Sequence, residues 1–272
     1  MKSKLTVKSF SKYLLILGIL FFESCGTVPL TGRSQLNLLP ESTMLSMSLT
    51  SYDEFLSSNT LSTNKTQVEM INRVGQNIAG AVEQYLAQNG YESYISNFDW
   101  EFNLVQDDTP NAWCMPGGKV VFYTGILPYT LNDAGVAVVM GHEIAHAVAR
   151  HGNERMSQSL LLELGGMTLS EALSEKPEET QALFSVAYGA VGQVGVMLPF
   201  SRTHEYEADE MGLIFMAMAG YDPREAVAFW KRMSDGNTSS TPEFLSTHPL
   251  DENRIAKLEK IMPTALAIYE SN

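Results

Sequence analysis

Apolar residues recur at helical spacing along much of this chain. In the stretch 67–88 they fall at intervals of three and four positions, and segments 41–56, 224–233 and 251–261 are also expected to be helical. This spacing buries one face of a helix and leaves the other face polar. The pattern therefore predicts helices distributed over the whole chain.

Two shorter stretches carry a different pattern. Apolar and polar residues alternate in 99–106, and 119–123 is a β-rich run that follows the turn sequence Pro116-Gly117-Gly118. Both patterns are typical of strands bounded by turns. The predicted fold class is therefore mainly α with a small β-sheet, that is, α+β.

The segment 153–200 is rich in Leu, Met, Ala and Gly, but charged residues interrupt it at 171–179. Neither half reaches the roughly 20 apolar residues that a membrane-spanning helix needs. We expect a helical insertion here, a pair of helices that could act as a lid.

The segment His142-Glu143-Ile144-Ala145-His146 carries the clearest chemical signal. Residues four positions apart lie on one face of a helix, so both imidazoles can bind the same ion. Glu143 lies about 100° round the helix and can reach a water beside that ion without being a ligand. We expect the helix over 133–151, with Gly152 ending it.

A catalytic zinc site needs about three protein ligands and one open position. On a continuous helix His151 points about 140° away from His146, so we expect it to compensate the helix dipole instead.

The segment 201–209, Ser-Arg-Thr-His-Glu-Tyr-Glu-Ala-Asp, offers a better third ligand at the start of an amphipathic helix. Glu205 and Asp209 share one face, so Glu205 could bind the ion while Asp209 accepts a hydrogen bond from a ligand imidazole. His204 is a rival ligand, although it points about 100° away from Glu205. Without a metal, the same acids would complement the helix dipole.

These two segments, together with 111–118 and with 247–250 followed by Arg254, resemble the M48 family of zinc metallopeptidases. The resemblance covers roughly 41–263, and within the family it is to Ste24-, HtpX- and Oma1-like members, in particular periplasmic lipoproteins of the BepA and LoiP type without a helical-repeat domain. It implies a zincin-like domain over 41–272.

The resemblance also assigns roles. It implies one Zn²⁺ per chain, held by His142, His146 and Glu205, with Asp209 supporting a ligand imidazole and Glu143 acting as general base. A developing alkoxide needs preorganised donors. By the same resemblance, His248 either stabilises the tetrahedral intermediate or binds the zinc and closes the site, and Arg254 lies near the oxyanion.

An exposed strand edge can bind an extended polypeptide through backbone hydrogen bonds. The resemblance places the strand 119–123 beside the zinc helix as such an edge. We therefore expect substrate-binding residues along this stretch: Asn111, Gly118, Val120, Val121 and Phe122. Cys114 is interpreted as a small buried hydrophobic residue.

The expected function is a zinc-dependent metalloendopeptidase in which Glu143 assists the attack of water on the peptide bond. The expected substrates are unfolded or misassembled envelope proteins. One alternative is a non-catalytic, chaperone-like envelope lipoprotein with a latent site. Another is a zinc aminopeptidase or amidase.

The N-terminus predicts a location. Four lysines precede a ten-residue apolar run at 13–22, and Cys25 follows it, as in a bacterial lipoprotein signal peptide over 1–24. We expect lipidation of Cys25, a linker over 25–40, and a membrane-anchored protein on the periplasmic face of the bacterial outer membrane. The formal net charge of −13 argues against nucleic-acid partners.

Overall fold

The computed structural model describes residues 25–163, 177–188, 201–235, 242–250 and 252–272. The predicted signal peptide over 1–24 lies outside the described residues, and so does much of the predicted insertion. Lipidation of Cys25 stays a prediction. No helix in the described ranges has both the length and the apolar character needed to cross a membrane.

A three-stranded sheet lies at the centre of the fold. It consists of β3 (Glu101–Val105), β4 (Ala112–Met115) and β5 (Lys119–Tyr123), in the order β3-β5-β4. The central strand β5 runs parallel to β3 and antiparallel to β4. The prediction that 119–123 forms an exposed edge is therefore wrong, because the ladders with both neighbours already use its backbone groups.

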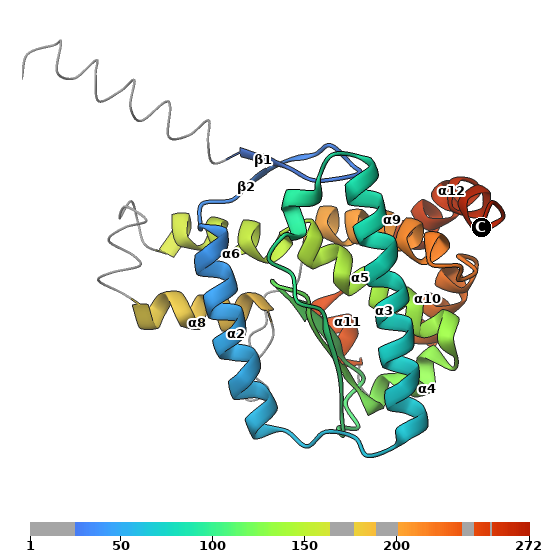
Figure 1. Ribbon diagram of the computed structural model, residues 1–272, viewed down its shortest axis with the longest axis horizontal. Helices are drawn as coiled ribbons and strands as arrows, with labels where there is room; N and C mark the ends of the chain where they lie inside the picture. The colour runs from blue at the N-terminus through green and yellow to red at the C-terminus, as the bar shows by residue number, and fades with distance from the viewer. Residues whose placement is uncertain (1–24, 164–176, 189–200, 236–241, 251) are drawn as a thin grey trace, which may run out of the picture.

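The side chains of the sheet alternate between two cores, as the period of two requires. Val121 and Tyr123 of β5 belong to a core with α2 (Glu41–Ser58), whereas Val120 and Phe122 belong to the larger core on the other face. That larger core contains α3 (Lys65–Gln88), α5 (Asp133–Val148) and α9 (Arg202–Met218). Figure 1 shows α2 and α3 on opposite sides of the sheet. The predicted α+β class is confirmed.

Shorter elements complete the described fold. The turns η1 and η2 and the helix α4 link the sheet to α3 and α5, and α10, α11 and α12 follow α9. Helices α6 and α8 pack on each other. Their bounds are η1 Glu92–Ile95, η2 Thr124–Ile126, α4 Leu127–Thr130, α6 His151–Glu163, α8 Pro177–Tyr188, α10 Glu225–Asp235, α11 Glu243–Thr247 and α12 Glu252–Tyr269.

Helices α5 and α9 cross at two glycines. A Cβ atom on Gly212 would lie 2.8 Å from the backbone nitrogen of His142, and one on Gly141 would lie 2.8 Å from the carbonyl oxygen of Gly212. Any larger residue would push the helices apart, since such short contacts are sterically forbidden. The two glycines therefore let α9 bring its first turns against the metal helix.

The metal helix ends earlier than the sequence predicts. Asn132 caps its start by accepting hydrogen bonds from two backbone N–H groups, but the helix stops at Val148 rather than at His151. Arg150 adopts φ 56°, in the left-handed region that interrupts a right-handed helix, and α6 begins directly after it. The guanidinium of Arg150 lies 4.3 Å from the ring centre of Tyr94, which helps to hold this turn.

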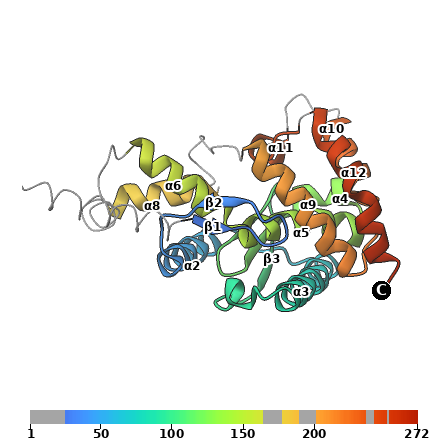
Figure 2. The same cartoon turned by 90° about the horizontal axis from the view of Figure 1, so that it is seen from above.

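The segment 25–40, expected to be a linker, contains a β-hairpin. Strands β1 (Cys25–Thr27) and β2 (Ser34–Leu36) pair antiparallel, and Leu30 packs against the main core from the loop between them. Viewed from above, the hairpin lies over α5 (Figure 2). The hairpin therefore lies beside the metal helix, although it precedes every long helix of the described structure in the sequence.

Candidate metal centre

Four buried side chains converge on one point between α5, α9 and the end of α11. They can each offer one ligand atom, and these atoms all lie within 4.8 Å of one another. The metal helix supplies two of them, α9 supplies one, and the residue that follows α11 supplies the fourth. The set consists of His142, His146, Glu205 and His248.

The separations fit a tetrahedral ion. Zinc bonds of about 2.0–2.2 Å place tetrahedral ligands roughly 3.3–3.6 Å apart. Nε2 of His142 lies 3.1 Å from Nε2 of His146 and 3.2 Å from Nδ1 of His248. Oε1 of Glu205 lies 3.1 Å from Nδ1 of His248 and 3.4 Å from Nε2 of His146. The structure therefore brings together the three predicted ligands and adds His248.

The donor chemistry also fits. Three imidazoles and one carboxylate suit zinc and similar transition metals, and His nitrogens packed this closely in a dry site need a shared cation or proton between them. Each of these side chains is at most 3% exposed. Burial alone would raise the pKa of Glu205, but His248 and Arg254 lower it well below its ordinary value, so this carboxylate is ionised and ready to bind a cation.

The far side of His142 is held by Asp209 and Arg254. Nδ1 of His142 lies 3.1 Å from Oδ1 of Asp209, whose carboxylate accepts two hydrogen bonds from Arg254, at 2.6 and 2.9 Å. Arg254 is fully buried, packs 3.6 Å from the ring centre of Trp230 and pairs with Glu205 at 2.8 Å. In this geometry Asp209 can accept the Nδ1 proton of His142 and leave Nε2 free for a metal.

The far side of His146 contacts a residue that the sequence analysis dismissed. Nδ1 of His151 lies 2.8 Å from Nδ1 of His146, and Nε2 of His151 lies 2.9 Å from Oε2 of Glu207. The expected 140° separation does not hold because α5 ends at Val148 and Arg150 is left-handed, so His151 does not continue the metal helix. Spacing alone carried no signal for this contact.

Glu143 points at the same site without joining the ligand set. Burial raises its pKa to about 7, partly offset by His248, and its Oε1 accepts no hydrogen bond from the described residues. Nε2 of His248 lies 3.3 Å from that oxygen. A buried carboxylate with a pKa near neutrality can both accept and return a proton.

His204, the rival ligand, faces another group. Its Nε2 lies 3.0 Å from Oε2 of Glu154, and its ring stacks on His151. Hydrogen bonds from His204 and Arg33 lower the pKa of Glu154 to about 2, although burial alone would raise it. His204 therefore belongs to a cluster behind the metal site.

All five predicted substrate residues are buried inside the protein. Val120, Val121 and Phe122 are fully buried, so they cannot contact a substrate. Strand β4 is the outer strand on that side of the sheet and packs against α5. Asn111, just before β4, accepts a hydrogen bond from the backbone of Ala112.

Cys114 of β4 is buried, as expected. Burial raises the pKa of its thiol well above the ordinary value, and Glu143 adds to the shift. The thiol is therefore protonated and acts as a small apolar side chain.

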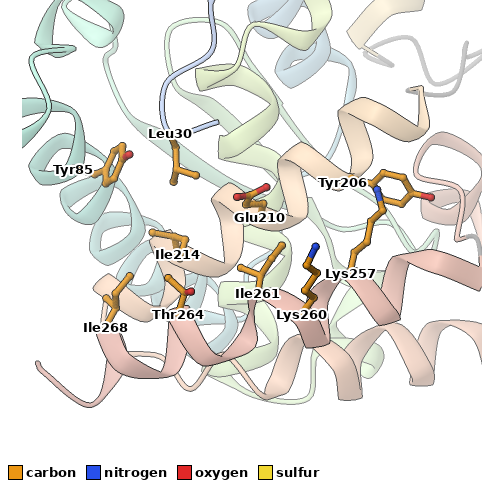
Figure 3. Close-up of a pocket in the computed structure, with 10 residues that line it drawn as sticks. All are labelled: Leu30, Tyr85, Tyr206, Glu210, Ile214, Lys257, Lys260, Ile261, Thr264 and Ile268. Carbon is orange, nitrogen blue, oxygen red and sulfur yellow. The ribbon is translucent and has the colours of Figure 1, made fainter. Parts of the chain in front are cut away.

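A separate pocket of about 570 Å³ opens between α9 and α12. Figure 3 shows its mixed lining, in which Lys260 of α12 points toward Glu210 of α9, Lys257 lies over the ring of Tyr206, and Leu30 reaches in from the hairpin. None of the four converging ligands lines this pocket. It lies apart from the metal centre.

This fold and site define a metallopeptidase of the HExxH class. The chain belongs to Peptidase family M48, whose sequence profile matches residues 76–262. The fold class and the family expected from the sequence are thereby confirmed.

Several relatives support this assignment. The chain is 31% identical over 257 residues to the mitochondrial metalloendopeptidase OMA1 of Schizosaccharomyces pombe, covering 94% of this chain and 72% of the relative. It is 30% identical over 269 residues to the mitochondrial metalloendopeptidase OMA1 of Bos taurus, covering 96% of this chain and 50% of that one. A β-barrel assembly-enhancing protease of Escherichia coli is 32% identical over 166 residues, covering 58% of this chain and 33% of the relative.

These matches correct the predicted location. The relatives that align along nearly the whole chain are named as mitochondrial proteins, whereas the β-barrel assembly-enhancing proteases align over a shorter part of it. The predicted location on the periplasmic face of a bacterial outer membrane is therefore wrong. Apart from the yeast protein of S. pombe, the chain spans about half or less of the length of the curated relatives it matches.

Proposed function

We propose that this chain is a zinc-dependent metalloendopeptidase that cleaves extended polypeptide segments. The observation that carries the proposal is the convergence of three imidazoles and one ionised carboxylate at tetrahedral spacing, with Glu143 directed at the same point. The names of the relatives as metalloendopeptidases agree with it.

His142, His146 and Glu205 would hold the metal. When bound, zinc would polarise the scissile carbonyl and lower the pKa of the attacking water. Glu143 accepts the proton from that water and later delivers it to the leaving amine, for which a pKa of about 7 is well matched. Arg254 holds the carboxylates of Asp209 and Glu205 in their ionised form throughout.

His248 has a second role in this proposal. Its Nδ1 occupies the fourth position of the ligand set, which a catalytic site must leave open for water and substrate. We therefore interpret the arrangement as a closed state. In a His248→Ala variant, a hydroxamate that chelates zinc should associate faster than with the wild type, as followed by stopped-flow displacement; an unchanged rate would show that His248 does not close the site.

The substrate would pair with β4, the outer strand beside α5. Because the β4 side chains are buried, this pairing would use the backbone groups at the outer edge of the strand. Backbone pairing on a strand edge reads an extended chain largely without regard to its sequence, which suits an endopeptidase. An unfolded protein such as casein is therefore a suitable test substrate, and mass spectrometry can map the cut sites. Internal cuts separate this activity from that of an aminopeptidase.

The decisive experiment combines metal content with cleavage. The purified chain should contain one zinc per molecule, and Glu143→Gln should retain it while the cleavage rate falls by about 10²- to 10⁴-fold, the range typical for loss of a general base. Wild-type activity in this variant would refute the mechanism. A chain that binds unfolded protein but makes no cuts when loaded with zinc would instead support the chaperone-like alternative.

A further inference from the structure

A second layer of side chains stands behind the metal ligand His146. His151 touches it, Glu207 touches His151, and Arg33 of the N-terminal hairpin touches Glu207. His146, His151 and Glu207 are each at most 5% exposed. Arg33 lies outside the segment 76–262 that matches the family profile, while the alignments with the OMA1 relatives extend over nearly the whole chain.

Proton positions follow from the geometry. An imidazole that gives Nε2 to a metal carries its proton on Nδ1, so Nδ1 of His146 donates to Nδ1 of His151. His151 must then carry its own proton on Nε2, where Oε2 of Glu207 accepts it at 2.9 Å. The same chain of bonds orients the His146 ring and keeps its Nε2 lone pair directed at the metal.

Arg33 binds the carboxylate of Glu207, at which this series of hydrogen bonds ends. Its Nε donates to Oε2 of Glu207 at 2.8 Å, and its two terminal nitrogens donate to the two oxygens of Glu154 at 3.0 and 2.8 Å. Thr31 donates a further hydrogen bond to Glu207. A guanidinium has the planar fork that such paired recognition needs, whereas an ammonium does not.

The hairpin that carries Arg33 is itself fixed. Its strands pair in register, Leu30 at its loop reaches toward α9 at the pocket of Figure 3, and Gly32 closes the turn with φ 70°. Beyond the hairpin, the backbone of Leu38 donates to Oγ of Ser157 in α6. The position of Arg33 is therefore fixed by an ordered hairpin.

We propose that His151 is a positioning residue for the zinc ligand His146 and that the N-terminal hairpin, through Arg33 and Glu207, is part of the metal site. The proposal rests on the proposed function in one respect, since it takes His146 as a ligand. It predicts that a residue of the N-terminal hairpin controls metal affinity.

The test measures zinc dissociation constants of the full chain by competition with a chelating dye, together with the visible absorption spectrum after cobalt substitution. His151→Phe keeps a planar ring but removes the acceptor, and should weaken zinc binding about 10- to 100-fold, the effect typical for loss of a partner behind a ligand. Arg33→Met should weaken it about tenfold and shift the cobalt spectrum. Arg33→Lys should restore part of the loss.

Two controls make the result specific. Arg73→Met removes an exposed Arg–Asp pair with Asp133 at the start of the same metal helix, and should leave the zinc constant unchanged. Combining Arg33→Met with His151→Phe should add less than twofold to the effect of His151→Phe alone, because Arg33 acts through His151. Full additivity would mean that Arg33 stabilises the fold and does not position the ligand.

Zinc constants of Arg33→Met and Arg33→Lys within twofold of the wild type would overturn the proposal, even if His151→Phe failed to fold. His146→Ala distinguishes this failure from failure of the proposed function. If the wild type binds no zinc, the proposed function fails; if the wild type binds zinc, His146→Ala loses it and the Arg33 variants bind normally, only the present inference fails.

Discussion

The two histidines of the metal helix are supported from opposite sides by different parts of the chain. Behind His142 stand Asp209 and Arg254, from α9 and α12. Behind His146 stand His151, Glu207 and Arg33, from α6, α9 and the N-terminal hairpin. Each support ends in an arginine that holds a carboxylate ionised.

The difference lies in burial. Arg254 is fully buried and pairs with two carboxylates, those of Glu205 and Asp209. The Arg33 side chain is 24% exposed, and the two carboxylates with which it pairs also bind His151 and His204. Removing the partner of a charge in a dry interior costs much stability, whereas removing the partner of a partly solvated charge costs less. We therefore expect the His142 side to contribute mainly to stability, and the His146 side to act more on metal affinity.

The largest effect should come from comparing Arg254→Met with Arg33→Met. Loss of Arg254 leaves buried carboxylates without a counter-charge and should lower the free energy of unfolding by about 3–5 kcal/mol. Loss of Arg33 should lower it by about 1–2 kcal/mol, because water and two histidines remain. Urea unfolding of both variants measures the difference, and equal losses would remove the distinction between the two sides.

The next effect concerns the crossing of α5 and α9, on which the side chains behind both histidines depend. Gly212→Ala places a methyl group 2.8 Å from the backbone nitrogen of His142, so α9 must move away from α5. We expect a loss of about 1–3 kcal/mol in the free energy of unfolding, as for other overpacked cores, and weaker zinc binding because Glu205 moves with α9. Gly220→Ala is unsuitable as a control because of its positive φ, but Gly80→Ala, which has open space around it, should leave zinc binding unchanged.

Low pH should reduce the stability that the pair of Arg33 and Glu154 contributes. The pKa of Glu154 is about 2 in the folded protein and ordinarily about 4.5, so its contribution is complete above the higher value and disappears as the pH falls toward the lower one. Between pH 5 and pH 2.5, wild type should lose more stability than Glu154→Gln, by roughly 1–2 kcal/mol after allowance for solvent screening at Arg33. Parallel pH dependences in urea unfolding would contradict this.

The smallest effect should come from Arg150→Gly. Glycine accepts φ 56° without strain, which offsets the lost contacts with Tyr94 and Glu41, so the free energy of unfolding should change by less than about 1 kcal/mol. Arg150→Val should lose more, because a β-branched residue resists this conformation. Zinc affinity that falls equally in both variants would show that the Arg150 side chain, and not the left-handed backbone at this position, supports His151.

Much of the site could be predicted from local spacing. His142, Glu143 and His146 follow from one turn of helix, and the i, i+4 pair of Glu205 and Asp209 from another, because a helix places such residues on one face whatever surrounds it. All five side chains are buried in the structure. The position of β5 could not be predicted in this way, since a strand pattern does not say which neighbours will pair with it.

Local patterns were enough to predict the fold class, the metal helix and the candidate ligands on α5 and α9, because helical periodicity and ligand chemistry act over a few positions. Long-range packing instead placed His151 against His146, β5 inside the sheet, and Arg33 against Glu207, 174 positions away in the chain. The position of His151 depends on the helix break at Arg150, and the position of α9 depends on the close crossing at Gly141 and Gly212. Periodicity along the chain does not record how far apart two segments end in space.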